Sequence, residues 1–227
     1  VFKNAKLRKY FKEVSMHSYW SGADTKKNAE NYLSDKYSKY SVAATEYCQM
    51  TDDKNTGVYD LIAKEKNGTN GTSIKYGVAM ANTIVDDLTI MNVNEWDWWT
   101  ACSYGTYTDG LIYLDEDNHE NLDFSKRYYC LGNFSKFIKE GAVRVACSSG
   151  VKNVRSVAFV NEDNTVVTVY VNNNDKKAYT TIDCEGDYAV YTTDRDNDIA
   201  KTDFGKAKKV KVSLPASSVV TVVYEAK

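Results

Sequence analysis

Residues 127–138 read RYYCLGNFSKFI, and this stretch separates two kinds of sequence. Its apolar positions recur at intervals of three and four residues, namely Tyr128, Leu131, Phe134 and Ile138. This spacing predicts an amphipathic helix, and Gly141 stands where its C-terminal cap is expected. Helical patterns alternate with short apolar runs before this helix, whereas nearly everything after it reads as strand.

The first 140 residues predict strands and helices in alternation. The expected strands are Val14–Tyr19, Val42–Glu46 and Met91–Trp98, and the expected helices are Asp24–Tyr37, Ile74–Asp87 and Lys126–Ile138. A strand followed by a helix, three times, is typical of parallel βαβ units. Three units are too few to close a barrel or to cover both faces of an open sheet, so we expect an upstream segment to complete this part.

The rest of the chain predicts six short strands, separated by turns rich in Asn, Asp and Gly. They are Val154–Val160, Val166–Val171, Ala178–Cys184, Tyr188–Thr192, Lys209–Leu214 and Val219–Tyr224. Strands of this number and spacing are typical of a β-sandwich. We therefore predict two domains, one over residues 1–140 and a β-sandwich over residues 141–227.

The composition is that of a globular chain with little net charge. The 227 residues carry a formal charge of −2, which gives no electrostatic footprint for nucleic acid. An apolar run of about 18 residues, as a membrane-spanning helix requires, does not occur in the sequence. The five cysteines are odd in number and never in C-x-x-C spacing, so we expect mostly buried thiols rather than a zinc site or a redox pair.

Chemistry is expected where the predicted parallel strands end, because functional groups gather at the carboxyl ends of strands in barrels and open parallel sheets. The three strand ends read HSYW at residues 17–20, TEYC at 45–48 and WDWW at 96–99. A carboxylate accompanied by a histidine and several aromatic rings is typical of a sugar-binding site. Glu46 is the expected nucleophile or base of that site.

Six motifs, taken in order, resemble glycoside hydrolase family 30. They are the three strand ends, DGLIY at 109–113, residues 127–138 with GAVRV at 141–145, and LPASSVVT at 214–221. The resemblance implies the C-terminal part of a (β/α)8 TIM barrel followed by a β-sandwich domain. It also implies a retaining hydrolase of β-linked sugars, and the second and third strand ends look most like the endo-β-1,6-galactanase-like branch.

The resemblance makes Glu46 the catalytic nucleophile at the end of the seventh barrel strand. The residues expected to bind substrate are His17, Tyr19, Trp20, Tyr47, Trp96 and Trp98. In the family, the acid lies in an Asn-Glu-Pro-like motif after the fourth strand, but the only proline here is Pro215. We therefore expect the acid on an upstream barrel segment of the same protein, which would be secreted and act on polysaccharide, with neither nucleic acid nor membrane as partner.

Several of these residues have alternative interpretations. Without the resemblance, Glu46 is more often a solvated or paired carboxylate, and His17 a histidine hydrogen-bonded in a core. Trp96 and Trp98 share one face by strand alternation, so one of them is expected to form the floor of the −1 subsite. Trp99 is open to a purely structural role in the core.

Other polar residues are expected to stay outside the chemistry. Glu95 follows Asn94 and so imitates the acid motif, but its place inside a strand favours a packed role or a supporting role around the site, and Asp97 shares this ambiguity. His119 is assigned to a solvated acidic turn. The aspartates of the long segment Tyr47–Ser73 lack the spacing of a calcium loop, so we predict no metal, and no cofactor is expected.

Two alternatives to a galactanase are kept. One is a non-catalytic carbohydrate-binding fragment, which keeps the aromatic residues without the acid. The other is a family 30 enzyme acting on xylan, β-1,6-glucan or glucosylceramide, because a fold does not fix a substrate. The segment Tyr47–Ser73 is expected to shape the substrate cleft, since long loops at the functional face of a barrel commonly do so.

Overall fold

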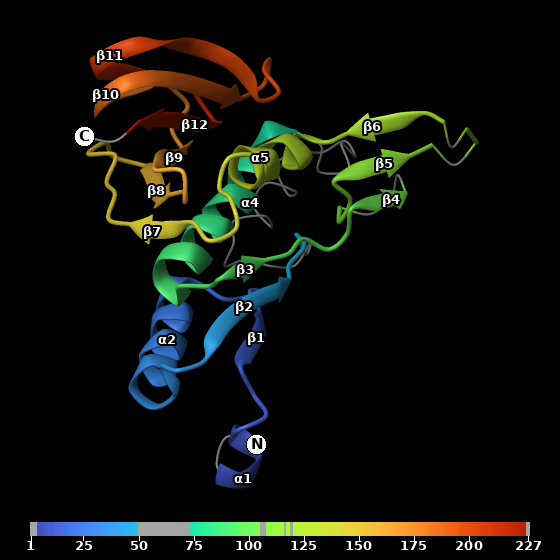
Figure 1. Cartoon of the computed structure of the whole chain (residues 1–227). Helices are drawn as coiled ribbons and strands as arrows, with labels where there is room; N and C mark the ends of the chain where they lie inside the picture. The colour runs from blue at the N-terminus through green and yellow to red at the C-terminus, as the bar shows by residue number, and fades with distance from the viewer. Residues whose placement is uncertain (1–3, 50–72, 105–107, 116, 119, 226–227) are drawn as a thin grey trace.

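A parallel sheet, a pair of helices and an antiparallel sheet follow one another across the molecule (Figure 1). The computed structural model describes residues 4–49, 73–104, 108–115, 117–118 and 120–225. The first elements in chain order are α1 (Ala5–Arg8), β1 (Glu13–His17), α2 (Ala23–Tyr37), β2 (Ser41–Glu46), α4 (Ile74–Asp86) and β3 (Glu95–Trp96). Strand and helix alternate in this part of the chain, as the sequence predicts.

The three strands β1, β2 and β3 form a parallel sheet with β2 in the centre. Residues Ala43 and Ala44 of β2 are fully buried. Ala44 belongs to a small apolar cluster with Met91 and Val93, and Leu33 of α2 packs against the same cluster. The central strand is therefore held by a neighbour on each edge and by helical residues on one face.

Strand β3 is shorter than predicted because helical conformation continues past α4. Residues Asp87–Met91 form a π-helical turn, and Asn92 then takes a left-handed conformation with φ of 53°. The expected strand Met91–Trp98 is reduced to two residues as a consequence. The backbone on each side of β3 still runs beside β2, because Asn94 and Asp97 each donate a main-chain hydrogen bond of 2.8 Å to that strand.

Helix α5 (Lys126–Ser135) packs closely along α4. A Cβ atom on Gly77 of α4 would lie 2.6 Å from the sulfur of Cys130 and 3.0 Å from the carbonyl oxygen of Lys126. Because a side chain would collide there with the neighbouring helix, glycine at this position sets how near the two helices come. The helix ends before the predicted Ile138, and Gly141 takes a φ of 80° in the turn that follows.

Between β3 and α5 the chain forms a small sheet that the sequence patterns do not predict. Its strands are β4 (Cys102–Tyr104), β5 (Ile112–Leu114) and β6 (Leu122–Phe124). Each has three residues, which is too short for an alternating pattern to be recognised. This sheet projects away from the helices and from the parallel sheet (Figure 1).

The last strands form one six-stranded antiparallel sheet, ordered β11-β10-β12-β9-β8-β7. They are β7 (Val143–Val145), β8 (Val154–Val160), β9 (Thr165–Asn172), β10 (Ala178–Thr193), β11 (Ala200–Leu214) and β12 (Ser218–Glu225). Two strands that the sequence predicts separately are both parts of β10. The pairing of β10 with β11 is irregular between Asp183 and Gly186, which is where the sequence pattern breaks.

Strands β9 and β12, which we call the shared wall, are buried on both faces. One apolar cluster lies between the shared wall and the helices α4 and α5, and its members include Met80, Ile84, Phe134, Val169 and Val219. A second cluster joins the other face of the wall to β10 and β11, and its members include Tyr170, Ile182, Val212, Leu214 and Val220. Neighbouring residues of one strand thus enter different cores, as the two-residue period of a strand requires.

Candidate active site

Glu46 is the last residue of β2, the central strand of the parallel sheet. The register with β1 shifts just before it, because Met16 pairs with Ala44 whereas His17 pairs with Glu46. Thr45 is the additional residue in β2. This irregularity places Glu46 directly beside His17 at the carboxyl end of the sheet, which is the end where the sequence predicts chemistry.

The carboxylate of Glu46 is held by one hydroxyl and approached by one imidazole. The Tyr19 hydroxyl donates a hydrogen bond of 2.9 Å to Glu46 Oε1, and His17 Nδ1 lies 3.8 Å from the same oxygen. The Glu46 side chain is 33% exposed and that of His17 is 47% exposed. An oriented and accessible carboxylate of this kind suits a nucleophile or a base.

Tyr19 remains a hydrogen-bond donor because its environment disfavours the phenolate. Burial raises the pKa of Tyr19 far above its usual value, and the neighbouring Cys48 thiol and Glu46 carboxylate raise this pKa further. The hydroxyl lies 3.6 Å from the sulfur of Cys48. The Tyr19 ring stacks on Tyr47, with 5.7 Å between centroids.

Substituting Tyr19→Phe in the full-length protein is expected to lower kcat by about tenfold to a hundredfold while the ring packing is kept. A hydrogen bond to a charged group is worth about 1.5–3 kcal/mol, and this one fixes the carboxylate that reacts. Steady-state rates on a substrate that the wild type cleaves measure the effect. Tyr10→Phe, at an exposed tyrosine, is the matched control, and an equal loss in both variants would exclude a specific role for Tyr19.

Trp20 lies beside Tyr19 and remains open to solvent. Its side chain is 48% exposed, and its ring centroid lies 5.6 Å from that of Tyr19. The backbone of Trp20 is left-handed, with φ of 52°, which is uncommon for a bulky residue. The structure therefore brings together four of the predicted site residues at the end of β1 and β2: His17, Tyr19, Trp20 and Glu46.

The other three predicted substrate-binding residues, Tyr47, Trp96 and Trp98, are buried or partly buried and contact one another. Tyr47 is fully buried, and its ring centroid lies 6.0 Å from that of Trp96 and 5.9 Å from that of Trp98. The indole N–H of Trp96 donates to Asp87 at the end of α4. Trp96 and Trp98 also pack against the core around α4 and α5. A sugar-platform role for these two indoles stays a prediction, and their contacts here are structural.

Trp99, for which the sequence left a core role open, is 54% exposed. Exposure alternates along residues 95–99, with Glu95, Asp97 and Trp99 exposed and the two tryptophans between them partly covered. The main-chain N–H of Trp99 donates to the main-chain carbonyl of Tyr47, so Trp99 lies next to Tyr47, which directly follows Glu46. The sequence pattern does not predict that the Trp99 ring is exposed, so it did not identify Trp99 as a site residue.

Glu95 and Asp97 form an exposed pair of carboxyl groups rather than a packed pair. A hydrogen bond to the Asp97 carboxyl, followed by its charge, raises the pKa of Glu95 above its usual value. Glu95 pairs with Ala43, which lies three residues before Glu46 on β2. The expected packed role is therefore not seen for Glu95 and Asp97, because both side chains are exposed, whereas a supporting role around the site stays a prediction.

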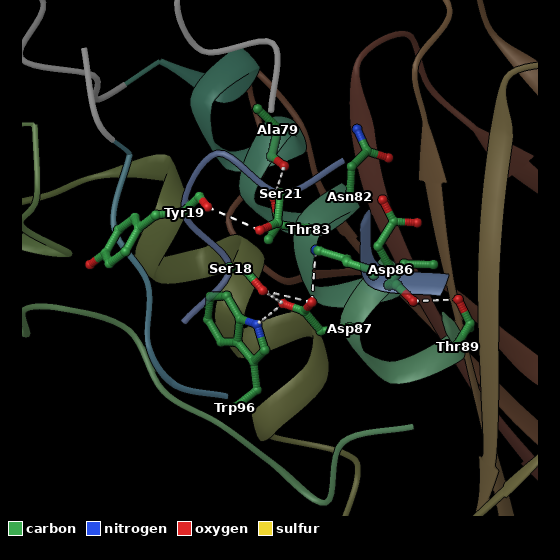
Figure 2. A network of polar contacts seen from close by, with 12 residues as sticks. Ser18, Tyr19, Ser21, Ala79, Asn82, Thr83, Asp86, Asp87, Thr89 and Trp96 are labelled. Carbon is green, nitrogen blue, oxygen red and sulfur yellow. Dashed lines mark hydrogen bonds and ion pairs between the residues drawn. The ribbon is translucent and has the colours of Figure 1, made fainter. Parts of the chain in front are cut away.

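A buried carboxylate, Asp87, lies behind the strand ends (Figure 2). It accepts hydrogen bonds from the Ser18 hydroxyl and from the Trp96 indole, and it forms an ion pair of 2.7 Å with Lys26. Ser18 and Lys26 are themselves buried. The sequence patterns do not predict this network, because Ser18, Lys26 and Asp87 lie in separate segments of the chain with no common spacing.

A second polar network is organised by Arg127, which is fully buried at the start of α5. Its guanidinium donates to the Gln49 side chain at 3.0 Å, to the Gly110 carbonyl at 2.9 Å and to the Tyr113 hydroxyl at 2.5 Å. Burial lowers the pKa of Arg127 below its usual value. Trp98 lies against the same guanidinium, with 5.5 Å between the ring centroid and Cζ.

Some predictions concern parts of the chain that the structure does not describe. His119 and most of the segment Tyr47–Ser73, with its aspartates, lie outside the described residues. Within the described ranges, no three His, Cys, Asp or Glu side chains come together as metal ligands. No helix in these ranges is long and apolar enough to cross a membrane. None of the five cysteines, all of which lie in the described ranges, forms a disulfide, and three of them are buried: Cys48, Cys130 and Cys184.

Two family profiles match the chain. The profile described as "O-Glycosyl hydrolase family 30" matches residues 5–113, and the one described as "Glycosyl hydrolase family 30 beta sandwich domain" matches residues 141–222. The two matches belong to one family and together cover most of the chain.

Solved structures resemble the chain along nearly its whole length. A GH30 endoxylanase from Clostridium papyrosolvens C71 is 21% identical with a TM-score of 0.74, and the match covers 100% of this chain and 52% of that one. A conserved exported protein from Bacteroides fragilis is 25% identical with a TM-score of 0.78, covering 94% and 46%. An endo-β1,6-glucanase is 17% identical with a TM-score of 0.62, covering 100% and 44%.

These matches establish the fold of the chain. It consists of the C-terminal part of a TIM barrel followed by a β-sandwich, as the sequence predicts. The chain spans about half the length of the solved structures that it matches.

Proposed function

This chain belongs to glycoside hydrolase family 30, and from that premise we propose that its protein hydrolyses a β-linked polysaccharide with Glu46 as the nucleophile. The observation that carries the proposal is the hydrogen bond from Tyr19 to Glu46 at the end of the central parallel strand. Catalytic groups of a TIM barrel lie at this end of its strands. His17 approaches this carboxylate, and Trp20 lies beside Tyr19 with its ring exposed, which suits a sugar site.

The proposed reaction is a double displacement with retention. Glu46 attacks the anomeric carbon while an acid protonates the departing oxygen, and water then hydrolyses the glycosyl-enzyme. The acid must stand about 5–5.5 Å from the nucleophile. We assign it to an upstream barrel segment of the same protein. The Tyr19 hydroxyl orients the Glu46 oxygen that it contacts, and His17 is placed to contact either this carboxylate or a sugar hydroxyl.

The proposed substrate is β-1,6-galactan, on the likeness of TEYC and WDWW to the galactanase-like branch. Xylan and β-1,6-glucan are alternatives of equal support, because the matched structures include an endoxylanase and an endo-β1,6-glucanase. Trp20 lies beside Tyr19, Trp99 is bonded to the Tyr47 main chain, and both rings are exposed, so we propose them as the rings that contact sugar. We further propose that the protein is secreted, as the exported relative from Bacteroides fragilis suggests.

Incubating the full-length protein with each of the three polysaccharides tests the proposal. We expect new reducing ends from one of them, in fragments of several lengths as an endo-acting enzyme produces. Proton NMR of the first products should show the β-anomer, which then equilibrates, because two displacements restore the starting configuration. An initial α-anomer would exclude the double displacement. Binding of a polysaccharide without release of reducing ends would establish the carbohydrate-binding alternative.

A further inference from the structure

We propose that Asp87 is a positioning residue for Glu46, acting from behind the sheet on the two strands that flank the nucleophile strand. This inference rests on the proposed function, because it concerns how the same carboxylate is aligned. Asp87 lies where α4 passes into the π-helical turn and is completely buried. It touches neither Glu46 nor the open face of the site, so its effect must pass through its hydrogen-bond partners.

The first partner fixes the end of β1. The Ser18 hydroxyl lies 2.7 Å and 2.8 Å from the two carboxylate oxygens of Asp87. Ser18 stands between His17 and Tyr19, the two residues that approach Glu46. Figure 2 shows the Ser18 hydroxyl directed at Asp87, whereas the Tyr19 ring points away from it. Anchoring Ser18 on the helix side therefore holds its two neighbours on the side of the nucleophile.

The second partner fixes β3, the other neighbour of β2. The Trp96 indole N–H donates a hydrogen bond of 2.9 Å to Asp87 Oδ2. The ring of Trp96 lies against Tyr47, which directly follows Glu46 and also stacks on Tyr19. Tyr47 is thus confined between a ring on β3 and a ring after β1. The Asp87 carboxylate is hydrogen-bonded to both sides of Tyr47, through Ser18 after β1 and through Trp96 on β3.

The third partner explains why the group is a carboxylate rather than an amide. Lys26 of α2 is buried and places its ammonium 2.7 Å from Asp87 Oδ1. A buried ammonium requires a charged partner. With both oxygens accepting, Asp87 serves Lys26, Ser18 and Trp96 at once, whereas an amide has one oxygen to accept and two N–H groups that would meet other donors.

The adjacent residue Asp86 provides a matched comparison. Its carboxylate pairs with Arg155 of β8, in the antiparallel sheet, through two hydrogen bonds. The two aspartates are consecutive on one helix end, but Asp87 is bonded to the strand ends of the site and Asp86 is bonded to the sandwich. Removing each charge in turn separates positioning of the nucleophile from general support of the fold.

Ser18→Ala in the full-length protein is the sharpest test, because it leaves the ion pair between Lys26 and Asp87 in place. We expect kcat on the polysaccharide that the wild type cleaves to fall about tenfold with KM unchanged, since a small displacement of an aligned group is costly. The double variant Asp87→Asn with Lys26→Met, which leaves no unpaired buried ammonium, should lose at least as much. Asp86→Asn should keep kcat within twofold even if its Tm falls.

A Ser18→Ala enzyme that folds and keeps its kcat would overturn the proposal, and so would an equal loss of kcat in Asp86→Asn. A crystal structure of Ser18→Ala provides a readout that needs no activity. We expect the distance from the Tyr19 hydroxyl to Glu46 Oε1, 2.9 Å in the wild type, to exceed hydrogen-bonding range. If the wild type cleaves none of the polysaccharides, the proposed function fails, whereas an unchanged distance in the variant refutes the positioning role.

Discussion

Glu46→Gln in the full-length protein is expected to lower kcat by about 10³-fold or more, because an amide does not form the glycosyl ester on which a double displacement depends. Polysaccharide binding should persist, since Gln at position 46 still accepts the hydrogen bond from Tyr19. Release of reducing ends and affinity electrophoresis measure the two properties separately. The Glu46→Gln variant is therefore expected to lose turnover but to keep polysaccharide binding.

The smaller variant Glu46→Ala adds a chemical test of the same role. Azide should enter the space left by the carboxylate and yield a glycosyl azide of the α-configuration from an activated β-glycoside of the matching sugar. Glu95→Gln is the control, because Glu95 is an exposed carboxylate on the neighbouring strand. If Glu95→Gln abolished turnover while Glu46→Gln did not, the nucleophile would have to be reassigned.

Arg127→Met is expected to destabilise the full-length protein by about 3–5 kcal/mol, which corresponds to a fall in Tm on the order of 10 °C. The methionine fills much of the space but leaves the Gln49 and Gly110 oxygens without the Arg127 donor, whereas the Tyr113 hydroxyl still accepts from the Gly110 main-chain N–H. Each hydrogen bond to a charged group contributes about 1.5–3 kcal/mol, and unpaired buried acceptors add a desolvation cost. Differential scanning calorimetry measures the change.

The neighbouring cation supplies the control for this variant. Lys126 forms an ion pair of 2.6 Å with Asp198, and the two side chains are 18% and 45% exposed. Because this pair reaches solvent, it contributes about 1 kcal/mol, so Lys126→Met should change Tm by only a few degrees. A Tm of Arg127→Met equal to that of Lys126→Met would show that the buried network does not support the fold.

The order of the long strands and helices was predictable. Helix α2 and strand β8 follow their predicted ranges closely, and β8 is an apolar run of the length expected for a buried strand. The π-helical turn at Asp87–Met91 was not predictable, because its apolar residues read equally as a buried strand. Strands β4, β5 and β6 depend on pairing between distant residues, which local periodicity does not record.

The site was predictable to the level of the strand end but not to the level of side-chain direction. Alternation correctly put Trp96 and Trp98 on one face, yet it does not say which face. The contact of Trp96 with Asp87 decides this, and it depends on how α4 ends. Glu46 and Tyr19 meet because an additional residue, Thr45, shifts the register. A bulge of this kind has no signature in the local sequence.

The shared wall of β9 and β12 has a consequence for dissecting the protein. Cutting the chain near residue 140 would strip the helices from one face of that wall and expose valines such as Val167, Val169, Val171 and Val219 to water. A contiguous apolar surface of this kind promotes aggregation. The sandwich is therefore not a portable module that can be fused to another protein. Any graft has to carry α4 and α5 with it.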